Sequence, residues 1–211
     1  MSGDRLTIAI PRGALMVEAL DCLERAGIDT AEVRSNDRKL HFPDVGIVTV
    51  RPSDVPTYVE SGAADLGITG KDVLVEQSYR EFVELADLDF GGCTMVVASI
   101  AGSPDPMDVA AARLGVIRVA TKYPKQAGAW FAAHGKQVEI VEVKGSVELA
   151  PLTGMADGIV DLVASGATLR ENGLVARAEI STTTARLIAN PVSHRLKAAE
   201  MDRVAALMTR A

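Results

Sequence analysis

Short apolar runs alternate along the chain with stretches whose apolar side chains have helical spacing. The runs predict strands at residues 6–10, 46–50, 64–69, 82–88, 94–99, 116–121, 137–143, 159–163, 174–180 and 186–189. Two more short strands are expected within 33–42. Helices are predicted at 15–25, 51–61, 125–134 and 191–209, with short ones after 70–72 and from 169 onward. This alternation predicts the α/β class, with parallel or mixed sheets flanked by helices.

A glycine pair, Gly91 and Gly92, interrupts this pattern, and the alternation then starts again. The interruption predicts two lobes. In α/β folds, ligands bind at the carboxyl ends of strands and often between domains. The chain is expected to contain no internal repeat, and it shows no low-complexity linker.

Composition narrows the class of protein. The chain has 211 residues, of which 48% are hydrophobic, so it can bury one or two small cores. No apolar run reaches the roughly 20 residues of a membrane span, and the first residues lack the apolar region of a signal peptide, so a cytoplasmic protein is expected. The net charge of −6 disfavours nucleic-acid binding. Cys22 and Cys93 are expected to be buried thiols without a disulfide or zinc.

The most informative stretch runs from residue 148 to residue 169. Its apolar run at 159–163 carries Asp161, and the turn at 164–168 contains Ser165 and Thr168 before a helix begins. Backbone N–H groups and hydroxyls at such a turn bind a phosphate monoester, and a nearby carboxylate accepts hydrogen bonds from sugar hydroxyls. Together they suit a ribose 5-phosphate. The alternative is a plain tight connection with Thr168 as helix cap.

Two observations favour a binding site over a plain connection. Asp161 lies in an otherwise apolar run, where an unpaired carboxylate is costly. Glu148, Asp157 and Asp161 also fall within one short stretch, which is unusual for a buried strand.

Residues 148–169, with Asn172, Gly173 and Leu174 after them, closely resemble the signature of the ATP phosphoribosyltransferase family. Residues 38–40, 54–68, 70–74 and 119–123 are similar to further blocks of that family, so the resemblance covers nearly the whole chain. It implies a two-lobed fold similar to type II periplasmic binding proteins, with the active site in the cleft between the lobes. Lobe I would be 1–90 plus 182–211, and lobe II, with the phosphoribosyl pyrophosphate loop, 91–181.

The resemblance also implies a reaction and its residues. The family joins ATP, through adenine N1, to C1 of phosphoribosyl pyrophosphate and releases pyrophosphate, in the first step of histidine biosynthesis. Mg²⁺ is expected on the substrate, with no direct protein ligand. The family alignment places the cations Arg38 and Lys39 near the pyrophosphate, and Arg12, at the carboxyl end of the first predicted strand, is expected to be a catalytic cation beside them. The implied substrate-binding residues are Gly13, Arg51, Glu148, Asp157, Asp161, Ala164, Ser165, Gly166, Ala167 and Thr168. The alternative for each cation is a solvated surface charge.

One position departs from the family pattern. The family commonly has an arginine where this chain has Ala14, after Arg12 and Gly13. Three explanations stay open: Arg12 replaces that arginine, Arg34 reaches the site, or activity depends more on a partner.

The length resembles the short form of the family, which lacks a C-terminal regulatory domain. Short-form enzymes work with HisZ, a regulatory subunit similar to histidyl-tRNA synthetase. A hetero-oligomer with HisZ is therefore expected, with a homodimer as its core unit and with neither nucleic acid nor membrane as a partner.

Two other functions compete with this interpretation. Type I phosphoribosyltransferases also have a strand, acidic residues and a Ser/Thr-Gly-x-Thr turn, but normally two adjacent acids precede that turn, whereas Asp161 stands alone here. A non-enzymatic module of the periplasmic-binding type is the second alternative. Formation of phosphoribosyl-ATP discriminates between these possibilities.

Overall fold

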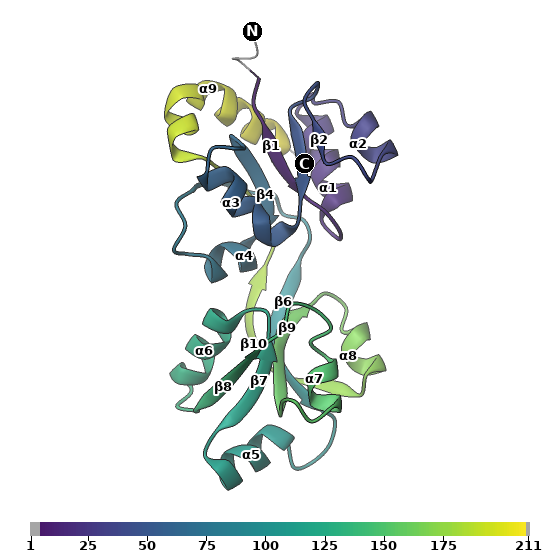
Figure 1. Ribbon diagram of the computed structural model, residues 1–211, viewed down its shortest axis with the longest axis vertical. Helices are drawn as coiled ribbons and strands as arrows, with labels where there is room; N and C mark the ends of the chain where they lie inside the picture. The colour runs from purple at the N-terminus through teal and green to yellow at the C-terminus, as the bar shows by residue number, and fades with distance from the viewer. Residues whose placement is uncertain (1–4, 210–211) are drawn as a thin grey trace. The chain divides into compact units, whose positions relative to one another are not determined.

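The computed structural model describes residues 5–209, and the chain divides into two compact units. Unit 1 consists of Met1–Gly92 and Thr184–Ala211, and unit 2 consists of Cys93–Thr183. Each unit contains a mixed β-sheet with helices on both faces (Figure 1). The chain therefore enters unit 2 directly after the glycine pair and returns to unit 1 before its last strand.

The sheet of unit 1 has the strand order β2-β3-β1-β4-β11-β5. Strands β1, β3 and β4 are mutually parallel, whereas β2 is antiparallel to β3, and β11 is antiparallel to both β4 and β5. The strand bounds are β1 Ile8–Pro11, β2 His41–Phe42, β3 Ile47–Val50, β4 Leu66–Gly70, β5 Val83–Asp87 and β11 Ala185–Ala189.

Helices cover both faces of this sheet because apolar side chains alternate along its strands. Ile8 and Ile10 belong to the core cluster under α1 (Met16–Arg25), α2 (Ala31–Ser35) and α9 (Pro191–Met208). Ala9 belongs to the opposite cluster, under α3 (Val55–Glu60) and α4 (Lys71–Glu76). A 3₁₀ turn, η1 (Pro52–Asp54), precedes α3.

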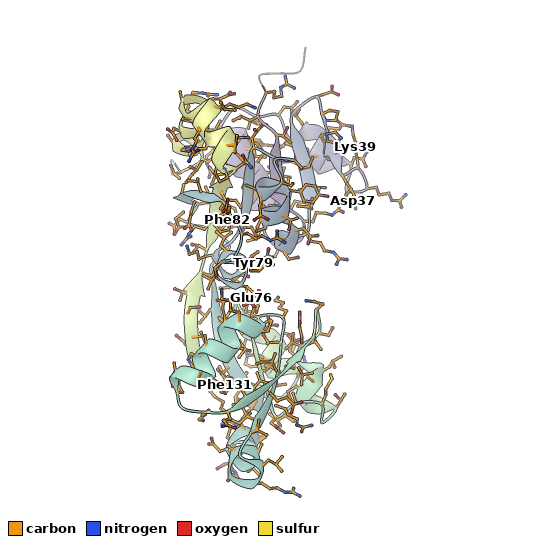
Figure 2. The ribbon with its side chains drawn as sticks, turned by 60° about the vertical axis from the view of Figure 1, so that its left-hand side comes forward. Asp37, Lys39, Glu76, Tyr79, Phe82 and Phe131 are labelled. Atoms are coloured by element: carbon orange, nitrogen blue, oxygen red, sulfur yellow. The ribbon has the colours of Figure 1, made fainter. Side chains whose placement is uncertain are left out.

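The sheet of unit 2 has the strand order β10-β6-β9-β7-β8. One face packs on α5 (Pro106–Leu114) and α6 (Pro124–Ala133), where Phe131 is fully buried (Figure 2). The other face packs on α7 (Leu149–Leu152) and α8 (Ala167–Glu171). The strand bounds are β6 Cys93–Ile100, β7 Ile117–Thr121, β8 Val138–Glu142, β9 Gly158–Val163 and β10 Leu174–Thr183.

The two sheets share one topology, which the sequence pattern did not predict. The order β3-β1-β4-β11-β5 of unit 1 corresponds to β8-β7-β9-β6-β10 of unit 2, with the same parallel and antiparallel neighbours. In both units the first of the three parallel strands in the sequence, β1 or β7, lies between the other two. The last of the three, β4 or β9, has an antiparallel strand, β11 or β6, on its other side. The prediction of no internal repeat was therefore wrong at the level of structure.

A five-residue motif repeats with this topology before β4 and before β9. It reads Ser-Gly-Ala-Ala-Asp at 61–65 and Thr-Gly-Met-Ala-Asp at 153–157. Its glycine has a positive φ in both copies, and its aspartate accepts a backbone N–H from the neighbouring strand region. The distances are 2.9 Å from Thr7 N to Asp65 Oδ2 and 2.8 Å from Arg118 N to Asp157 Oδ2. Such a short repeat does not stand out in a sequence read without structure.

Three element predictions need correction. Residues 33–42 form the helix α2 and the strand β2 instead of two strands, because a helix with only one buried residue, Val33, shows no periodicity. Helices α5 and α7 were not predicted. For α5 a signal was present, since Asp105 caps the helix through Met107 N–H and Pro106 is its first residue. Within residues 5–209, no helix has the length and apolarity to cross a membrane.

Candidate functional site

A cavity of about 250 Å³ opens at the carboxyl end of β9 in unit 2. Two carboxylates, Glu148 and Asp161, line it together with the connection from β9 to α8. The remaining lining residues are Cys93, Leu162, Val163, Ala164, Ser165, Gly166, Ala167, Thr168 and Leu169. The structure thus brings together nearly all the residues that were expected to bind the ribose 5-phosphate moiety.

The connection at residues 164–166 turns sharply into α8. Gly166 has a φ of +72°, a conformation that glycine adopts more readily than other residues. Among residues 5–209, the backbone N–H groups of Ser165, Gly166 and Thr168 have no hydrogen-bond acceptor. The Arg170 guanidinium donates to the Ser165 carbonyl at 3.0 Å and holds the turn from the α8 side. Free N–H groups and the hydroxyls of Ser165 and Thr168 are suitable donors for an anion.

Asp161 is the buried carboxylate of this cavity, with 15% of its side chain exposed. Its Oδ1 atom accepts the Leu162 N–H at 2.8 Å and lies 3.4 Å from Lys122 Nζ. Burial raises the pKa of Asp161, and the charge of Glu148 acts in the same direction, whereas Lys122 and the Leu162 N–H act to lower it. The net direction is upward, so the carboxylate is less favourable here than in water.

Asp157, the third predicted carboxylate ligand, does not line this cavity. It precedes the amino end of β9, whereas the cavity lies at the carboxyl end of that strand. Its Oδ2 accepts the Arg118 backbone N–H, and its Oδ1 lies 3.0 Å from the Arg118 guanidinium. Asp157 therefore ties β9 to β7, and sequence proximity to Asp161 was a misleading signal.

The predicted cations all lie in unit 1, in connections that follow its strands and helices. Arg12 and Gly13 follow β1, Arg51 follows β3, and Arg38 and Lys39 lie between α2 and β2. Arg12 Nη2 donates to the Asp37 carbonyl oxygen at 2.6 Å.

Lys39 forms an ion pair with Glu32, and its Nζ lies 5.0 Å from the Phe42 ring centre. Figure 2 shows Asp37 and Lys39 on the same side of unit 1. Arg38 and Arg51 are exposed and form no ion pair with any residue in the described range 5–209. Lys39 is therefore partly neutralised, whereas Arg38 and Arg51 keep their charges available for an anion.

Arg34 does not suit a role in replacing the arginine missing at Ala14. Its guanidinium pairs with Asp21 and Glu24, and these hydrogen bonds raise its pKa above the ordinary value. Of the two arginines considered as substitutes, only Arg12 lies in the same connection as Ala14. Gly13 between them has a φ of +88°, and a Cβ atom there would meet nothing within 4 Å beyond its chain neighbours.

Sequence reasoning missed several residues of the cavity. Leu162, Val163 and Leu169 flank predicted residues, so contiguity alone would have found them. Cys93 comes from β6, whose antiparallel pairing with β9 places Thr94 opposite Val163. That pairing has no local sequence signal. Cys93 is also only partly buried, in contrast to the expectation, whereas Cys22 is fully buried.

Comparisons with known proteins identify the family of this chain. A family model described as ATP phosphoribosyltransferase (HisG) matches residues 51–210. The ATP phosphoribosyltransferase of Rubrobacter xylanophilus is 50% identical over 198 residues, which are 93% of this chain and 91% of that protein. The chain belongs to the ATP phosphoribosyltransferase family. This membership makes it a pentosyltransferase and assigns it to the first step of histidine biosynthesis.

Other relatives extend this result to the whole chain and to the fold. The ATP phosphoribosyltransferase of Bacillus licheniformis is 46% identical over 211 residues, which are 98% of this chain and 95% of that protein. A solved ATP phosphoribosyl transferase (HisG:HisZ) complex from Thermotoga maritima contains a chain with 33% identity and a TM-score of 0.79, covering 96% of this chain and 95% of that one. The periplasmic aliphatic sulphonate binding protein SsuA of Escherichia coli, at 15% identity, has a TM-score of 0.57 over 97% of this chain and 71% of its own. The last likeness concerns the fold alone, which is of the type II periplasmic-binding kind.

Proposed function

We propose that the unit 2 cavity binds the ribose 5-phosphate moiety of phosphoribosyl pyrophosphate, which this enzyme joins to ATP. The observation that carries the proposal is the convergence of residues 164–168 with Glu148 and Asp161 on one cavity. The unpaired N–H groups and hydroxyls of the turn suit the 5-phosphate. The carboxylates suit the ribose hydroxyls, because an ionised carboxylate can only accept hydrogen bonds and a hydroxyl can donate one.

In the proposed reaction, adenine N1 attacks C1 of the ribose, and the C1–O bond to the diphosphate breaks. N1 already has a lone pair, so no general base is needed to form the nucleophile. Positive charge develops at C1 and negative charge on the leaving diphosphate. Catalysis then depends on alignment and on electrostatic stabilisation.

Arg12, Arg38 and Lys39 are proposed to stabilise the leaving diphosphate, and Arg51 to bind substrate phosphates with Gly13 beside Arg12. Arginine suits this task because its planar guanidinium is permanently charged and binds phosphate oxygens in pairs. Arg38 is the strongest candidate, because among residues 5–209 Lys39 is paired with Glu32 and Arg12 is hydrogen-bonded to the Asp37 carbonyl, whereas no such contact competes with the substrate for Arg38.

Magnesium is proposed to arrive on the substrate. Within residues 5–209, no group of three or more His, Cys, Asp or Glu side chains is placed to hold a metal ion. The diphosphate of the substrate binds Mg²⁺ through its own oxygens. Bound there, the ion neutralises charge on the leaving group.

The first test is formation of phosphoribosyl-ATP from ATP, phosphoribosyl pyrophosphate and Mg²⁺, followed by absorbance, in the wild type and in Thr168→Val. Loss of a hydrogen bond to a charged group costs about 1.5–3 kcal/mol. We therefore expect the KM for phosphoribosyl pyrophosphate to rise roughly 10- to 100-fold, with the KM for ATP changed much less. Thr182→Val, at an exposed position of β10, is the matched control. Equal weakening of both substrates would contradict the assignment of the turn.

The second test concerns the leaving group. Arg38→Ala is expected to lower kcat more than it raises KM, because stabilisation of the departing diphosphate is realised in the transition state. Arg113→Ala, on α5, removes a cation at a position outside every proposed role and should leave both constants unchanged. If the Arg38→Ala enzyme has the kcat of the wild type, Arg38 is not a catalytic residue.

The chain is further proposed to act in the cytoplasm as part of a hetero-oligomer with a HisZ-type regulatory subunit. The solved relative from Thermotoga maritima is a HisG:HisZ complex. Co-purification of this chain from its native host, with mass measurement of the complex, tests the assembly. Recovery of the chain only as a homo-oligomer would contradict it.

A further inference from the structure

We propose that Lys122 is a positioning residue for phosphoribosyl pyrophosphate: its ammonium group orients the Asp161 carboxylate and keeps it ionised toward the ribose. Lys122 is not among the cavity-lining residues, so it acts through Asp161. The inference rests on the proposed function of the cavity and adds Lys122, which directly follows the neighbouring strand β7.

The sheet itself brings these two residues together. Strands β7 and β9 are parallel neighbours, with Ala120 opposite Ile159 and Thr121 opposite Val160. Continued one residue beyond the end of β7, this register places Lys122 opposite Asp161. Ala120 and Ile159 both belong to the core cluster on the α7 and α8 face. Because side chains alternate between faces, the residues two positions further along belong to that same face.

The contacts of Asp161 divide its two oxygens between two tasks. Oδ1 accepts the Leu162 N–H and lies 3.4 Å from Lys122 Nζ. Oδ2 forms no hydrogen bond with any residue of the described range 5–209. Fixing Oδ1 on two donors sets the plane of the carboxylate and leaves Oδ2 for a ligand hydroxyl.

The charges around the cavity explain why a cation is needed here. Glu148 and Asp161 line the same cavity that is proposed to receive a phosphate with almost two negative charges. Arg170 of α8 faces the turn, but its guanidinium is engaged with the Ser165 carbonyl. On the β6 side, the residue opposite Asp161 is the uncharged Val96. Lys122 is therefore the cation that the described structure pairs with Asp161.

Protonation is the consequence of removing that cation. Burial raises the pKa of Asp161, Glu148 adds to this effect, and Lys122 opposes it. Without Lys122, the pKa of Asp161 rises further, and a larger fraction of the enzyme carries a protonated Asp161 at any given pH. A protonated carboxyl group accepts hydrogen bonds from the ribose less well, so binding fails at a higher pH than in the wild type.

The experiment measures kcat/KM for phosphoribosyl pyrophosphate against pH in the wild type, Lys122→Met and Lys122→Arg. An opposite charge at this distance shifts a carboxyl pKa by about one unit or more. The acid limb of the profile is therefore expected to move up by about one pH unit in Lys122→Met and to return in Lys122→Arg. Lys136→Met is the control for the substitution itself, because Lys136 is exposed to a similar degree as Lys122 and its Nζ also lies 3.4 Å from a carboxylate, that of the exposed Asp108. An acid limb unchanged by Lys122→Met overturns the proposal.

Binding of ribose 5-phosphate, measured by calorimetry at two pH values, separates this inference from the function of the cavity. If Thr168→Val weakens binding and Lys122→Met does not at either pH, the cavity assignment stands and the role of Lys122 fails. If neither substitution affects binding, the assignment of the cavity fails with it. Thermal unfolding of each variant checks that a loss does not come from misfolding, since a structural defect lowers affinity at both pH values without moving the acid limb.

Discussion

Asp157 and Asp161 are four positions apart, yet they serve different purposes because they lie at opposite ends of β9. Asp157 precedes the strand and binds the backbone N–H and guanidinium of Arg118. Asp161 lies near the carboxyl end, beside the turn that lines the cavity. The position of a carboxylate along a strand, rather than its distance from a motif in the sequence, decides whether it stabilises the sheet or meets a ligand.

This difference predicts separate effects of substitution. Asp157→Ala leaves the Arg118 N–H without its acceptor, and a buried unsatisfied donor costs about 1–3 kcal/mol. We expect a lower free energy of unfolding in denaturant titration and a KM for phosphoribosyl pyrophosphate that stays within about twofold of wild type. A raised KM with unchanged stability would return Asp157 to the binding site.

At this scale the sequence predicts contiguous features well and distant ones poorly. The turn at 164–168 was predictable because its hydroxyls and glycine lie in one stretch, and the structure places all five residues on the cavity. Lys122 and Cys93 were not predictable as neighbours of that turn. Cys93 begins β6 and Lys122 directly follows β7, and only the register of these two strands against β9 brings them near the turn.

Among the elements, buried strands were predictable, whereas the helices α2, α5 and α7 were not. The predicted strand at 159–163 corresponds to β9 (Gly158–Val163), because a continuous apolar run is a strong signal. Helix α2, at five residues, is too short to show periodicity. The pairing of strands into two equivalent sheets also lay beyond the sequence, because the antiparallel strands β6 and β11 join their sheets across long stretches of chain.

The equivalent strands β4 and β9 each contain a glycine that is packed closely against a helix. A Cβ at Gly67 in β4 would lie 2.6 and 2.7 Å from methyl carbons of Val55 and Val59 on α3. A Cβ at Gly158 in β9 would meet Met107 Sδ at 2.3 Å and the Ala98 carbonyl oxygen at 3.1 Å. An alanine would be overpacked at both sites. At Gly67 the neighbouring valine side chains are stiff and cannot move away, whereas at Gly158 the methionine side chain can change rotamer.

We therefore predict that Gly67→Ala destabilises the protein more than Gly158→Ala. Overpacking a core typically costs about 1–3 kcal/mol, and Gly67→Ala should fall in the upper part of that range because α3 must move. Denaturant unfolding of both variants measures the difference. Gly128→Ala, on α6 with nothing within 4 Å of its Cβ position, is the control for the alanine itself. A larger loss for Gly158→Ala would mean that Met107 cannot adapt.

Across the whole molecule, the two units differ in how their carboxylates respond to acid. Within the part of unit 1 that the structure describes, three carboxylates have a lowered pKa. Hydrogen bonds from Thr30 and Arg34 lower the pKa of Glu24, and those from the Glu81 N–H and Arg80 lower that of Glu60. For Asp87, burial acts to raise the pKa, but hydrogen bonds and nearby cations lower it overall. In unit 2, the pKa of Asp161 is raised.

These shifts predict that acid weakens unit 1 more than unit 2. A carboxylate with a lowered pKa stabilises the fold above its unfolded value, about 4, and that contribution is lost as the pH falls through the lower folded value. Asp161 contributes to stability with the opposite sign. Its ionised form destabilises the folded state, and this destabilisation disappears as the pH falls through its raised pKa.

Hydrogen exchange at about pH 6 and about pH 3.5, converted to protection factors, should therefore show a greater loss of protection in Met1–Gly92 than in Cys93–Thr183. Glu60→Gln removes one of the responsible groups, so the loss in unit 1 should become smaller in that variant. An equal loss of protection in both units would show that the ion pairs of unit 1 do not control its stability in acid.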